Sequence, residues 1–337
     1  MADHKRKILV TGANGFVGSA VVSELAEAGI YDVYGLVGKN AKIDRENQNP
    51  KQIFRTNIAE YESFREAENL RNIETLIHTA GLAHQFGRVE PEDFRKVNVQ
   101  GTENVCRLAQ KIGIRHFILI SSVAVYGNYG NSEIDETYVC RPAGIYAESK
   151  LESENAAREF CEKNNIRLTI VRPATVIGEG DRGNTSRLIT QIDNGRFVWV
   201  GRGSNRKSLI YKKDVARGIL KIVESLADSP HEIYNLSAEP VSMREVVGTI
   251  FGTLQKKSPR FRIPEGFVRG LFRVNRSGLA FVRLKNFEKT FEKWVSNDIF
   301  SGRKFNEKFG FRCDTAVSEA LARQVRFYLM QKNKNSD

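Results

Sequence analysis

The sequence predicts an α/β protein built on a doubly wound parallel sheet, and three observations support this fold class. Short apolar runs of strand length alternate with amphipathic helical stretches through the first two thirds of the 337 residues. A glycine-rich segment, TGANGFVG at 11–18, follows the first apolar run and opens the first helical stretch. Gly29, Gly113 and Pro173 then mark the ends of individual elements.

The expected elements follow one another in a regular order. The strands expected from apolar runs are Lys7–Thr11, Val33–Val37, Thr75–His78, Phe117–Ser121 and Leu168–Arg172. The helices expected from apolar residues at helical spacing are Gly15–Ala28, Ser63–Glu68, Asn98–Ile112 and Ala143–Glu162. Glycine-rich loops at 178–183 and 195–204 follow, and Ser208–Tyr211 and Ile233–Leu236 read as short strands that return to the sheet. A capping box at Ser242–Glu245 opens a helix to about Leu254.

The composition is that of an ordinary globular protein, with 41% hydrophobic and 27% charged residues. The four cysteines lie far apart and have no histidine nearby at ligand spacing, which disfavours a disulfide framework and a metal site and favours a reducing cytoplasm. No apolar stretch approaches the ~20 residues that span a bilayer, and no signal-peptide core is present. We therefore expect a cytoplasmic protein without a bound metal.

The net charge of +12 belongs mainly to the C-terminal quarter, because residues 255–337 hold 19 basic and 8 acidic side chains. Ten phenylalanines lie among the basic residues between 256 and 311. Five large apolar residues recur there at helical spacing: Phe281, Leu284, Phe287, Phe291 and Trp294. An amphipathic helix that covers a substrate cleft explains this pattern, and so does a membrane contact through 256–300. No recognised nucleic-acid-binding module is present, so we expect no nucleic-acid partner.

The segment Thr11–Gly18 has the features of a dinucleotide-binding loop. Gly12 permits a tight turn, Gly15 permits the backbone to approach a pyrophosphate, and Gly18 permits the helix to pack closely on the strand. The diphosphate then meets the free N–H groups and the positive dipole end of the helix. The acidic residue expected about 20 residues later, which binds the ribose of NAD, is missing, and Lys39 stands there instead. Lys39 could meet the extra phosphate of NADP or be a solvated lysine, so the choice between NAD and NADP stays open.

Tyr146 and Lys150 lie four residues apart, which places them on one face of the predicted helix. Chance supplies a second such pair at Tyr328 and Lys332. Only the first pair follows a strand that ends in serine, at Ser122, and a phosphate-binding loop. Because the ordinary pKa of tyrosine is near 10, a nearby cation is needed to make it a base, and Lys150 together with an oxidised nicotinamide would supply that charge.

Seven ordered motifs resemble the extended short-chain dehydrogenase/reductase family, in its NAD-dependent epimerase/dehydratase group. Six lie within residues 7–240: TGxxGxxG at 11–18, HTAG at 78–81, NVQGT at 98–102, SSVAVYG at 121–127, YxxxK at 146–150 and RP at 172–173. A weaker seventh lies near the C-terminus, at 297–311. The stretches 78–84 and 205–211 look most like enzymes that act on UDP-N-acetylhexosamines for surface polysaccharides.

The resemblance implies a Rossmann-type sheet of about seven strands with a smaller substrate-binding domain. The dinucleotide-binding domain would comprise residues 1–172 together with 208–240, which return to the sheet. The substrate-binding domain would comprise residues 173–207 and 241–330. It implies a homodimer through the helices at 98–112 and 143–162. The implied cofactor-binding residues are Gly12, Asn14, Gly15, Phe16, Val17, Gly18, Lys39, Asn57, Ile58, Ala80, Gly81, Asn98, Tyr146, Lys150 and Pro173.

The resemblance gives Ser122, Tyr146 and Lys150 catalytic roles, with Ser122 also on the substrate and Lys150 on the nicotinamide ribose. Asn98 would hold local backbone or relay water, or it caps a helix. Further substrate contacts, on a UDP-sugar, would come from Asn184, Arg206, Lys207 and Arg303. Arg206 and Lys207 compete for the place of a diphosphate-binding cation.

Two absences narrow the reaction. Val123 and Ala124 stand where 4,6-dehydratases of this group carry an acidic pair, which disfavours elimination. Residues 123–146 include Cys140 but no histidine, which disfavours 3,5-epimerisation. A C4 epimerase or a 4-keto reductase remains. A reductase of lipophilic alcohols or steroids and a dinucleotide sensor without catalysis are the alternatives.

Overall fold

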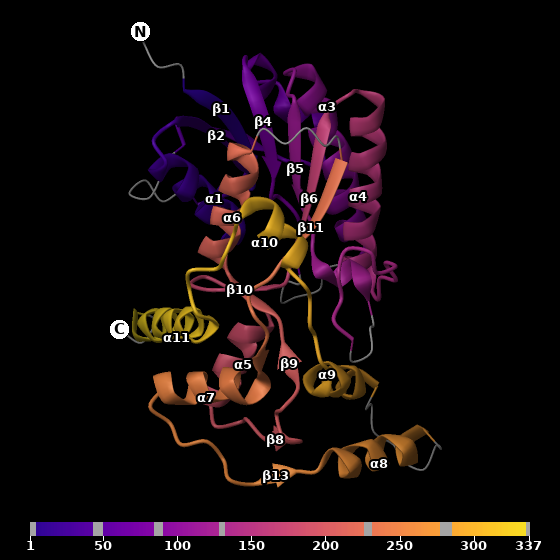
Figure 1. Cartoon of the computed structure of the whole chain (residues 1–337), viewed down its shortest axis with the longest axis vertical. Coiled ribbons are helices and arrows are strands. Elements are labelled where there is room, and N and C mark those ends of the chain that lie inside the picture. Colours follow the sequence, from indigo (N-terminus) through magenta and orange to yellow (C-terminus); the bar gives the residue numbers. More distant parts are fainter. Residues whose placement is uncertain are drawn as a thin grey trace.

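The computed structural model describes residues 5–42, 50–83, 90–127, 132–225, 231–276 and 285–334. A seven-stranded sheet, all of whose neighbouring strands pair in parallel, forms the upper half of the molecule in Figure 1. Across the sheet its strands are β3 (Gln52–Thr56), β2 (Tyr31–Gly38), β1 (Arg6–Thr11), β4 (Ile73–His78), β5 (His116–Ile120), β6 (Arg167–Pro173) and β11 (His231–Leu236). The predicted fold class is confirmed.

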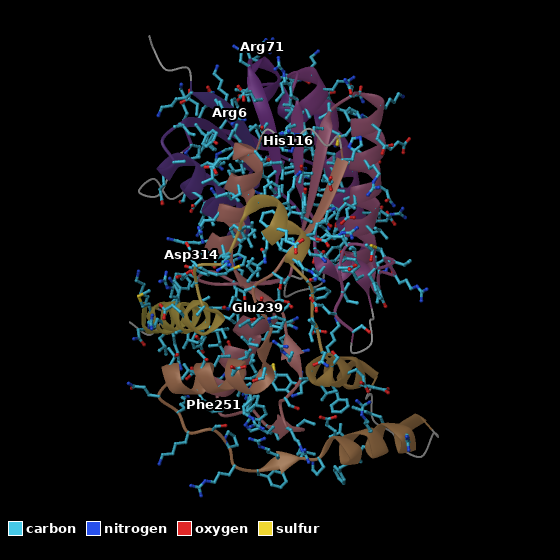
Figure 2. The ribbon with its side chains drawn as sticks, viewed as in Figure 1. Arg6, Arg71, His116, Glu239, Phe251 and Asp314 are labelled. Atoms are coloured by element: carbon cyan, nitrogen blue, oxygen red, sulfur yellow. The ribbon has the colours of Figure 1, made fainter. Side chains whose placement is uncertain are left out.

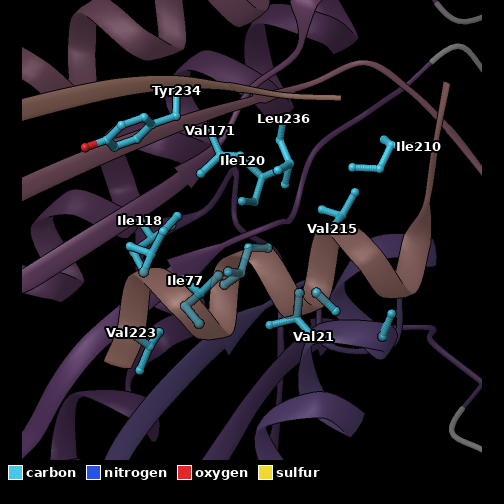
Figure 3. Close-up of a cluster of buried hydrophobic side chains, with 14 of the residues drawn as sticks. Val21, Ile77, Ile118, Ile120, Val171, Ile210, Val215, Val223, Tyr234 and Leu236 are labelled. Atoms are coloured by element: carbon cyan, nitrogen blue, oxygen red, sulfur yellow. The ribbon is translucent and has the colours of Figure 1, made fainter. Parts of the chain in front are cut away.

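Helices cover both faces of this sheet, because its strands are apolar on both sides. Helices α1 (Phe16–Glu27) and α6 (Lys212–Glu224) pack together on one face, and α3 (Gly101–Lys111) and α4 (Ile145–Lys163) on the other. Successive residues of β5 alternate between the two layers: Ile118 and Ile120 meet the α1–α6 layer, while Phe117 and Leu119 meet the α3–α4 layer. Figure 3 shows the first of these cores, where Val21 of α1 and Val215 of α6 lie close to Ile77 and Ile120.

The lower half of the molecule in Figure 1 holds three small two-stranded sheets and several helices. The strand pairs are β7 (Thr175–Ile177) with β10 (Leu209–Tyr211), β9 (Arg206–Lys207) with β12 (Val241–Ser242), and β8 (Trp199–Val200) with β13 (Arg262–Ile263). The helices of this half are α5 (Asn184–Asp193), α7 (Met243–Thr253), α8 (Glu265–Arg276), α9 (Lys285–Val295) and α11 (Val317–Lys334). Helix α10 (Arg303–Phe309) lies beside the large sheet, where it contacts β11. A separate apolar core joins α5, α7 and α11, and it includes Phe251, which is labelled in Figure 2.

The structure departs from the predicted elements in several places. Strand β3 and helices α5, α6, α10 and α11 are additional, and the helix expected at Ser63–Glu68 is replaced by two 3-10 turns, Tyr61–Phe64 and Ala67–Asn69. The helix expected from Asn98 begins earlier, with α2 (Pro91–Phe94) and a π-helical turn at Arg95–Gln100 before α3. Of the two returning strands, 233–236 lies in the large sheet, whereas 209–211 pairs with β7 outside it.

Ser242 caps α7 through the capping box with Glu245, as predicted. Phe281, Leu284 and His84 lie outside the described residues. No helix within the described ranges is long and apolar enough to cross a membrane. The division into two domains stays a prediction.

Candidate active site

The sheet reverses its strand order between β1 and β4, which are parallel neighbours. In open α/β sheets, ligand sites form at the carboxyl ends of the strands at such a point. The hydroxyl of Thr11, at the end of β1, lies 2.6 Å from Nδ1 of His78, at the end of β4, and accepts a hydrogen bond from the backbone N–H of Ala80 at 3.2 Å. The other ring nitrogen of His78 lies 3.1 Å from the Thr102 hydroxyl. Burial lowers the pKa of His78 to about 3, so this imidazole is neutral and fixes the floor of the site.

The glycine loop wraps over this floor in a way that admits no larger side chains. Gly12 has a φ of +66°, and a Cβ on it would lie 2.8 Å from the backbone of Ala80. A Cβ on Gly18 would overlap the carbonyl oxygen of Gly12 and lie 2.5 Å from the Thr79 hydroxyl. Gly15 precedes α1, and no side chain caps the free N–H groups at the start of this helix. The loop and the uncapped helix end fit a dinucleotide diphosphate.

The other residues predicted to meet the cofactor lie around this loop. Asn14 is exposed, Phe16 and Val17 are half-buried in the first turn of α1, and Pro173 ends β6. Gly81 follows Ala80 after the end of β4, and a Cβ on Gly81 would lie 4.0 Å from Nζ of Lys150. The backbone carbonyl of Ile58 accepts a hydrogen bond from the Asn104 side chain.

Lys39 is held by a neighbour rather than left free. Its Nζ donates to Glu60 at 3.0 Å, and Asn57 also donates to this carboxylate, at 2.7 Å. The hydrogen bond from Lys39 lowers the pKa of Glu60, so the carboxylate is charged at neutral pH. Because Glu60 offsets the charge of Lys39, this lysine offers less positive charge to the 2′-phosphate of NADP.

Asn98 is a positioning residue in the π-helical turn and does not cap a helix. Its Oδ1 accepts from the Leu82 N–H at 2.7 Å, while its Nδ2 donates to the Leu82 carbonyl and to the Ser149 hydroxyl. The amide therefore ties the segment that follows β4 to the helix that carries Tyr146. Of the roles predicted for Asn98, the structure shows that of holding local backbone.

The predicted catalytic residues converge at the carboxyl end of β5. Ser122 follows β5 and caps a 3-10 turn, Val123–Tyr126, by accepting from the Ala124 N–H at 3.1 Å. Tyr146 and Lys150 lie one turn apart on α4. Lys150 Nζ donates to the carbonyl of Ile120 at 2.7 Å, which fixes the ammonium below the end of the same strand.

The pKa values of this cluster follow from burial. Burial raises the pKa of Tyr146, and a hydrogen bond with Ser122 lowers it, with burial the larger effect. Burial likewise lowers the pKa of Lys150 to about 8, against an opposing effect of Glu154. Among the groups of the chain alone, burial therefore keeps the pKa of Tyr146 raised. The prediction that Lys150 and an oxidised nicotinamide together lower it stays a prediction.

A buried ion pair beneath the cluster was not predicted from the sequence. Glu154, one turn beyond Lys150, binds Arg172 of β6 through two hydrogen bonds of 2.9 and 2.5 Å, and both side chains are almost fully buried. The Arg172 guanidinium also lies 4.9 Å from the centre of the Tyr126 ring. Glu154 lies one turn from Lys150 in the sequence, which indicates that this carboxylate can meet a cation. The fold shows that the cation it binds is Arg172.

The predicted substrate residues occupy separate places. Asn184 begins α5 behind Gly183. Arg206 is exposed on β9 and donates to the Pro240 carbonyl at 2.8 Å, whereas Lys207 is buried and bound to Asp298 and the Lys293 carbonyl, each at 2.6 Å. Arg303 begins α10 and lines a surface hollow of about 810 Å³, together with residues of α4, β6 and β11 but without Ser122, Tyr146 or Lys150.

The chain is similar to several known proteins. The sequence matches the family described as "NAD dependent epimerase/dehydratase family" over residues 8–237. An N-acetyl-alpha-D-glucosaminyl-diphospho-ditrans,octacis-undecaprenol 4-epimerase from Escherichia coli O157:H7 is 29% identical over 97% of each chain. A 3 beta-hydroxysteroid dehydrogenase/Delta 5-->4-isomerase from Mycobacterium tuberculosis is 26% identical over 97% of this chain and 93% of its own. A UDP-glucuronic acid 4-epimerase from Bacillus cereus, solved with NAD, superposes with a TM-score of 0.75 at 20% identity over 96% of this chain and 99% of its own.

Proposed function

The chain belongs to the NAD-dependent epimerase/dehydratase family, and on this premise we propose that it is a 4-epimerase of a diphosphate-linked hexose. The observation that carries the proposal is the convergence of Ser122, Tyr146 and Lys150 on the carboxyl end of β5, across from the glycine loop. This arrangement supports oxidation and reduction at a carbinol carbon. The similarity to two sugar 4-epimerases supports C4 as that carbon.

NAD is the cofactor of this family. When bound, NAD would supply a reversible hydride acceptor for the sugar carbon. Glycines 12 and 18 and the uncapped start of α1 would hold the diphosphate, and Lys150 the nicotinamide ribose. The ion pair of Lys39 with Glu60 favours NAD over NADP, because it leaves no unpaired cation at Lys39 for an extra phosphate.

In the proposed reaction, Tyr146, Ser122 and Lys150 each have a part in the proton transfer. In this scheme the Tyr146 phenolate takes the proton of the C4 hydroxyl and gives it back after the ketone has turned its other face. Ser122 donates to the reacting oxygen and keeps it in line with Tyr146. Lys150, fixed by the Ile120 carbonyl, keeps its positive charge close to the developing phenolate.

The residues next to Ser122 argue against elimination of water. Val123 and Ala124 form the first turn after Ser122, and neither can move a proton. The sugar therefore keeps all its hydroxyl groups in the proposed reaction. A 4-keto reductase uses the same three catalytic residues, and it differs from an epimerase because it consumes reduced cofactor.

We further propose an N-acetylated hexosamine as the substrate, carried by UDP or by a lipid diphosphate. The relative from Escherichia coli has an N-acetylglucosaminyl diphosphate in its name. Arg206 is the better candidate for the diphosphate, because its guanidinium is exposed while Lys207 is bound to Asp298. The predicted homodimer through α3 and α4 stays a prediction.

The deciding experiment supplies UDP-N-acetylglucosamine and, in a second reaction, undecaprenyl-diphospho-N-acetylglucosamine, each with NAD but without added reductant. NMR of the released sugar should show the galacto isomer in at least one reaction. In a separate reaction that supplies NADH and the 4-keto sugar, loss of NADH in proportion to the ketone, without epimerisation in the first two reactions, would instead establish a reductase. If neither sugar reacts and a 3β-hydroxysteroid reduces NAD, the proposal is wrong and the similarity to the steroid dehydrogenase becomes the guide.

A further inference from the structure

The end of the molecule farthest from the large sheet carries an unusual surface. Strands β8 and β13 and helix α8 lie together there, at the bottom of Figure 1. Residues 256–276, which form β13, α8 and the loop before them, contain seven basic residues and one acidic residue. The excess of positive charge in the C-terminal quarter is therefore concentrated on one edge of the fold.

Helix α8 has apolar residues on two sides, one that faces the protein and one that faces solvent. Val268 and Phe272 are buried, and the Phe272 ring lies 5.4 Å from that of Phe291 on α9. Phe267 and Leu271, which are four residues apart on another side of the helix, are 63% and 50% exposed. The inner side secures α8 to the protein, and the outer side presents large apolar groups to solvent.

Two further large apolar side chains are exposed next to the paired strands beside α8. Arg262 of β13 pairs with Trp199 of β8, so the residues just before them, Phe261 and Val198, occupy neighbouring positions. Phe261 is 73% exposed and Val198 is 51% exposed. Four exposed apolar side chains therefore lie at one end of the fold, and we call them, with the basic residues of 256–276, the α8 surface.

Several basic residues of this surface have no acidic partner among the residues that the structure describes. Arg269 pairs with Glu292 at 2.6 Å, and Lys256 pairs with Asp193. Lys257, Arg260 and Arg273 are exposed and form no ion pair within the described ranges. The surface thus combines phenylalanine and leucine side chains with uncompensated positive charge.

We propose that the α8 surface docks on an anionic lipid bilayer. Aromatic and aliphatic side chains flanked by lysine and arginine are the combination that binds the boundary between headgroups and acyl chains. Anionic lipids attract such a segment over about a Debye length, and apolar insertion then holds it. A symmetric contact with a second copy of the chain would place the same positive charges opposite each other, which is unfavourable.

Docking would also orient the substrate-binding side of the protein. Asn205, next to β9, donates to the carbonyls of Trp294 and Ser296 at 2.8 and 2.9 Å, and Lys207 donates to the Lys293 carbonyl. Helix α9 therefore connects the α8 surface to the strand that carries Arg206 and Lys207. A diphosphate carried on a membrane lipid would be available on that side, although docking itself does not depend on the proposed reaction.

The test is co-flotation of the full chain with vesicles of phosphatidylcholine alone and of phosphatidylcholine mixed with phosphatidylglycerol. We expect binding only to the mixed vesicles and weaker binding in high salt. Each basic residue near an anionic surface changes binding by about fivefold. The double variant Lys257→Glu/Arg260→Glu should therefore lose at least about tenfold, and Phe267→Glu/Leu271→Glu should lose a similar amount.

The matched controls are Ile30→Glu, which changes an apolar residue that is 55% exposed beside the large sheet, and Arg65→Glu, which reverses an exposed charge. Both should float like the unaltered chain. Circular dichroism and NAD binding establish that each variant folds. Absence of flotation by the unaltered chain, or equal loss in the controls, would overturn the proposal. Dissociation of a dimer in the α8 variants alone, without vesicle binding, would assign the surface to a second copy.

Discussion

The hydroxyl of Tyr328 donates to the carboxylate of Asp193 at 2.9 Å. Lys332, four residues later, binds the same carboxylate at 2.5 Å, and Lys256 binds it from the loop after α7. The tyrosine and lysine that repeat the spacing of Tyr146 and Lys150 thus have a structural role, which is to anchor α11 to the end of α5. The same spacing places the proposed catalytic pair in one helix and a packing contact in the other.

Replacement of Asp193 by Asn tests this anchor. Hydrogen bonds from Lys256 and Lys332 lower the pKa of Asp193 to about 2. Because the folded pKa lies below the unfolded value, its stabilisation is complete above the unfolded pKa and is lost as the pH falls from about 5 towards 2. The two lysines are 40–50% exposed, so we expect a loss of only about 1 kcal/mol at pH 7. Urea unfolding at pH 7 and pH 3 measures this, and Asp193→Asn should show a weaker pH dependence than the unaltered chain.

Replacement of Tyr146 by Phe removes the proposed acid and base while keeping the ring. We expect turnover to fall by about 10²- to 10⁴-fold, because among the described residues Tyr146 is the group that lies one turn from Lys150 and next to Ser122 and can move the proton. NAD binding, measured by isothermal titration, should be unchanged. Tyr328→Phe is the matched control and should keep full activity. Full turnover of Tyr146→Phe would exclude this role for the phenol.

Replacement of Lys150 by Met separates activity from stability. Burial lowers the pKa of Lys150 to about 8, so the unfolded chain binds more protons between pH 8 and about 10.5, and the free energy of unfolding rises with pH in this window. The Lys150→Met variant would lack that rise. It would also be more stable than the unaltered protein by about 1–2 kcal/mol at pH 7, since the lost hydrogen bond to Ile120 offsets part of the gain.

The same variant should lose activity. In the unaltered protein, activity should decline above about pH 8 as the ammonium loses its proton. Denaturant unfolding at pH 7 and pH 9.5, together with a pH profile of turnover, measures both effects. A variant that is both active and destabilised would contradict the proposed role of Lys150.

Replacement of Gly18 by Ala tests the cofactor loop. The added Cβ would overlap the Gly12 carbonyl oxygen, so the loop must shift, at about 1–3 kcal/mol. We expect NAD to bind at least about tenfold more weakly, as titration of the intrinsic fluorescence would show. Gly248→Ala on α7 is the control, because no atom lies within 4 Å of its added Cβ and helix propensity alone should stabilise it slightly. Equal NAD affinity of the two variants would be evidence against the loop as the diphosphate site.

Elements with a strong local pattern were predictable, and those without one were not. Strand β5 is an uninterrupted apolar run and α4 a long helical stretch, and both were expected close to their observed bounds. Strand β3 is five residues long with alternating exposure, and it becomes a strand because β2 offers it a free edge. Helix α5 follows a glycine-rich loop, and its apolar side is explained only by the core that it shares with α7 and α11.

Local sequence patterns specify the sheet, the glycine loop and the spacing of Tyr146 and Lys150, because periodicity and glycine conformation act over a few residues. The fold sets which partner each side chain meets. In the fold, Lys207 is buried against Asp298, Glu154 forms an ion pair with Arg172, and Tyr328 donates a hydrogen bond to Asp193. The fold also raises the pKa of Tyr146, since burial depends on residues distant in the chain. Charge and hydrogen bonding of a side chain follow from its neighbours in space, and local sequence does not specify those neighbours.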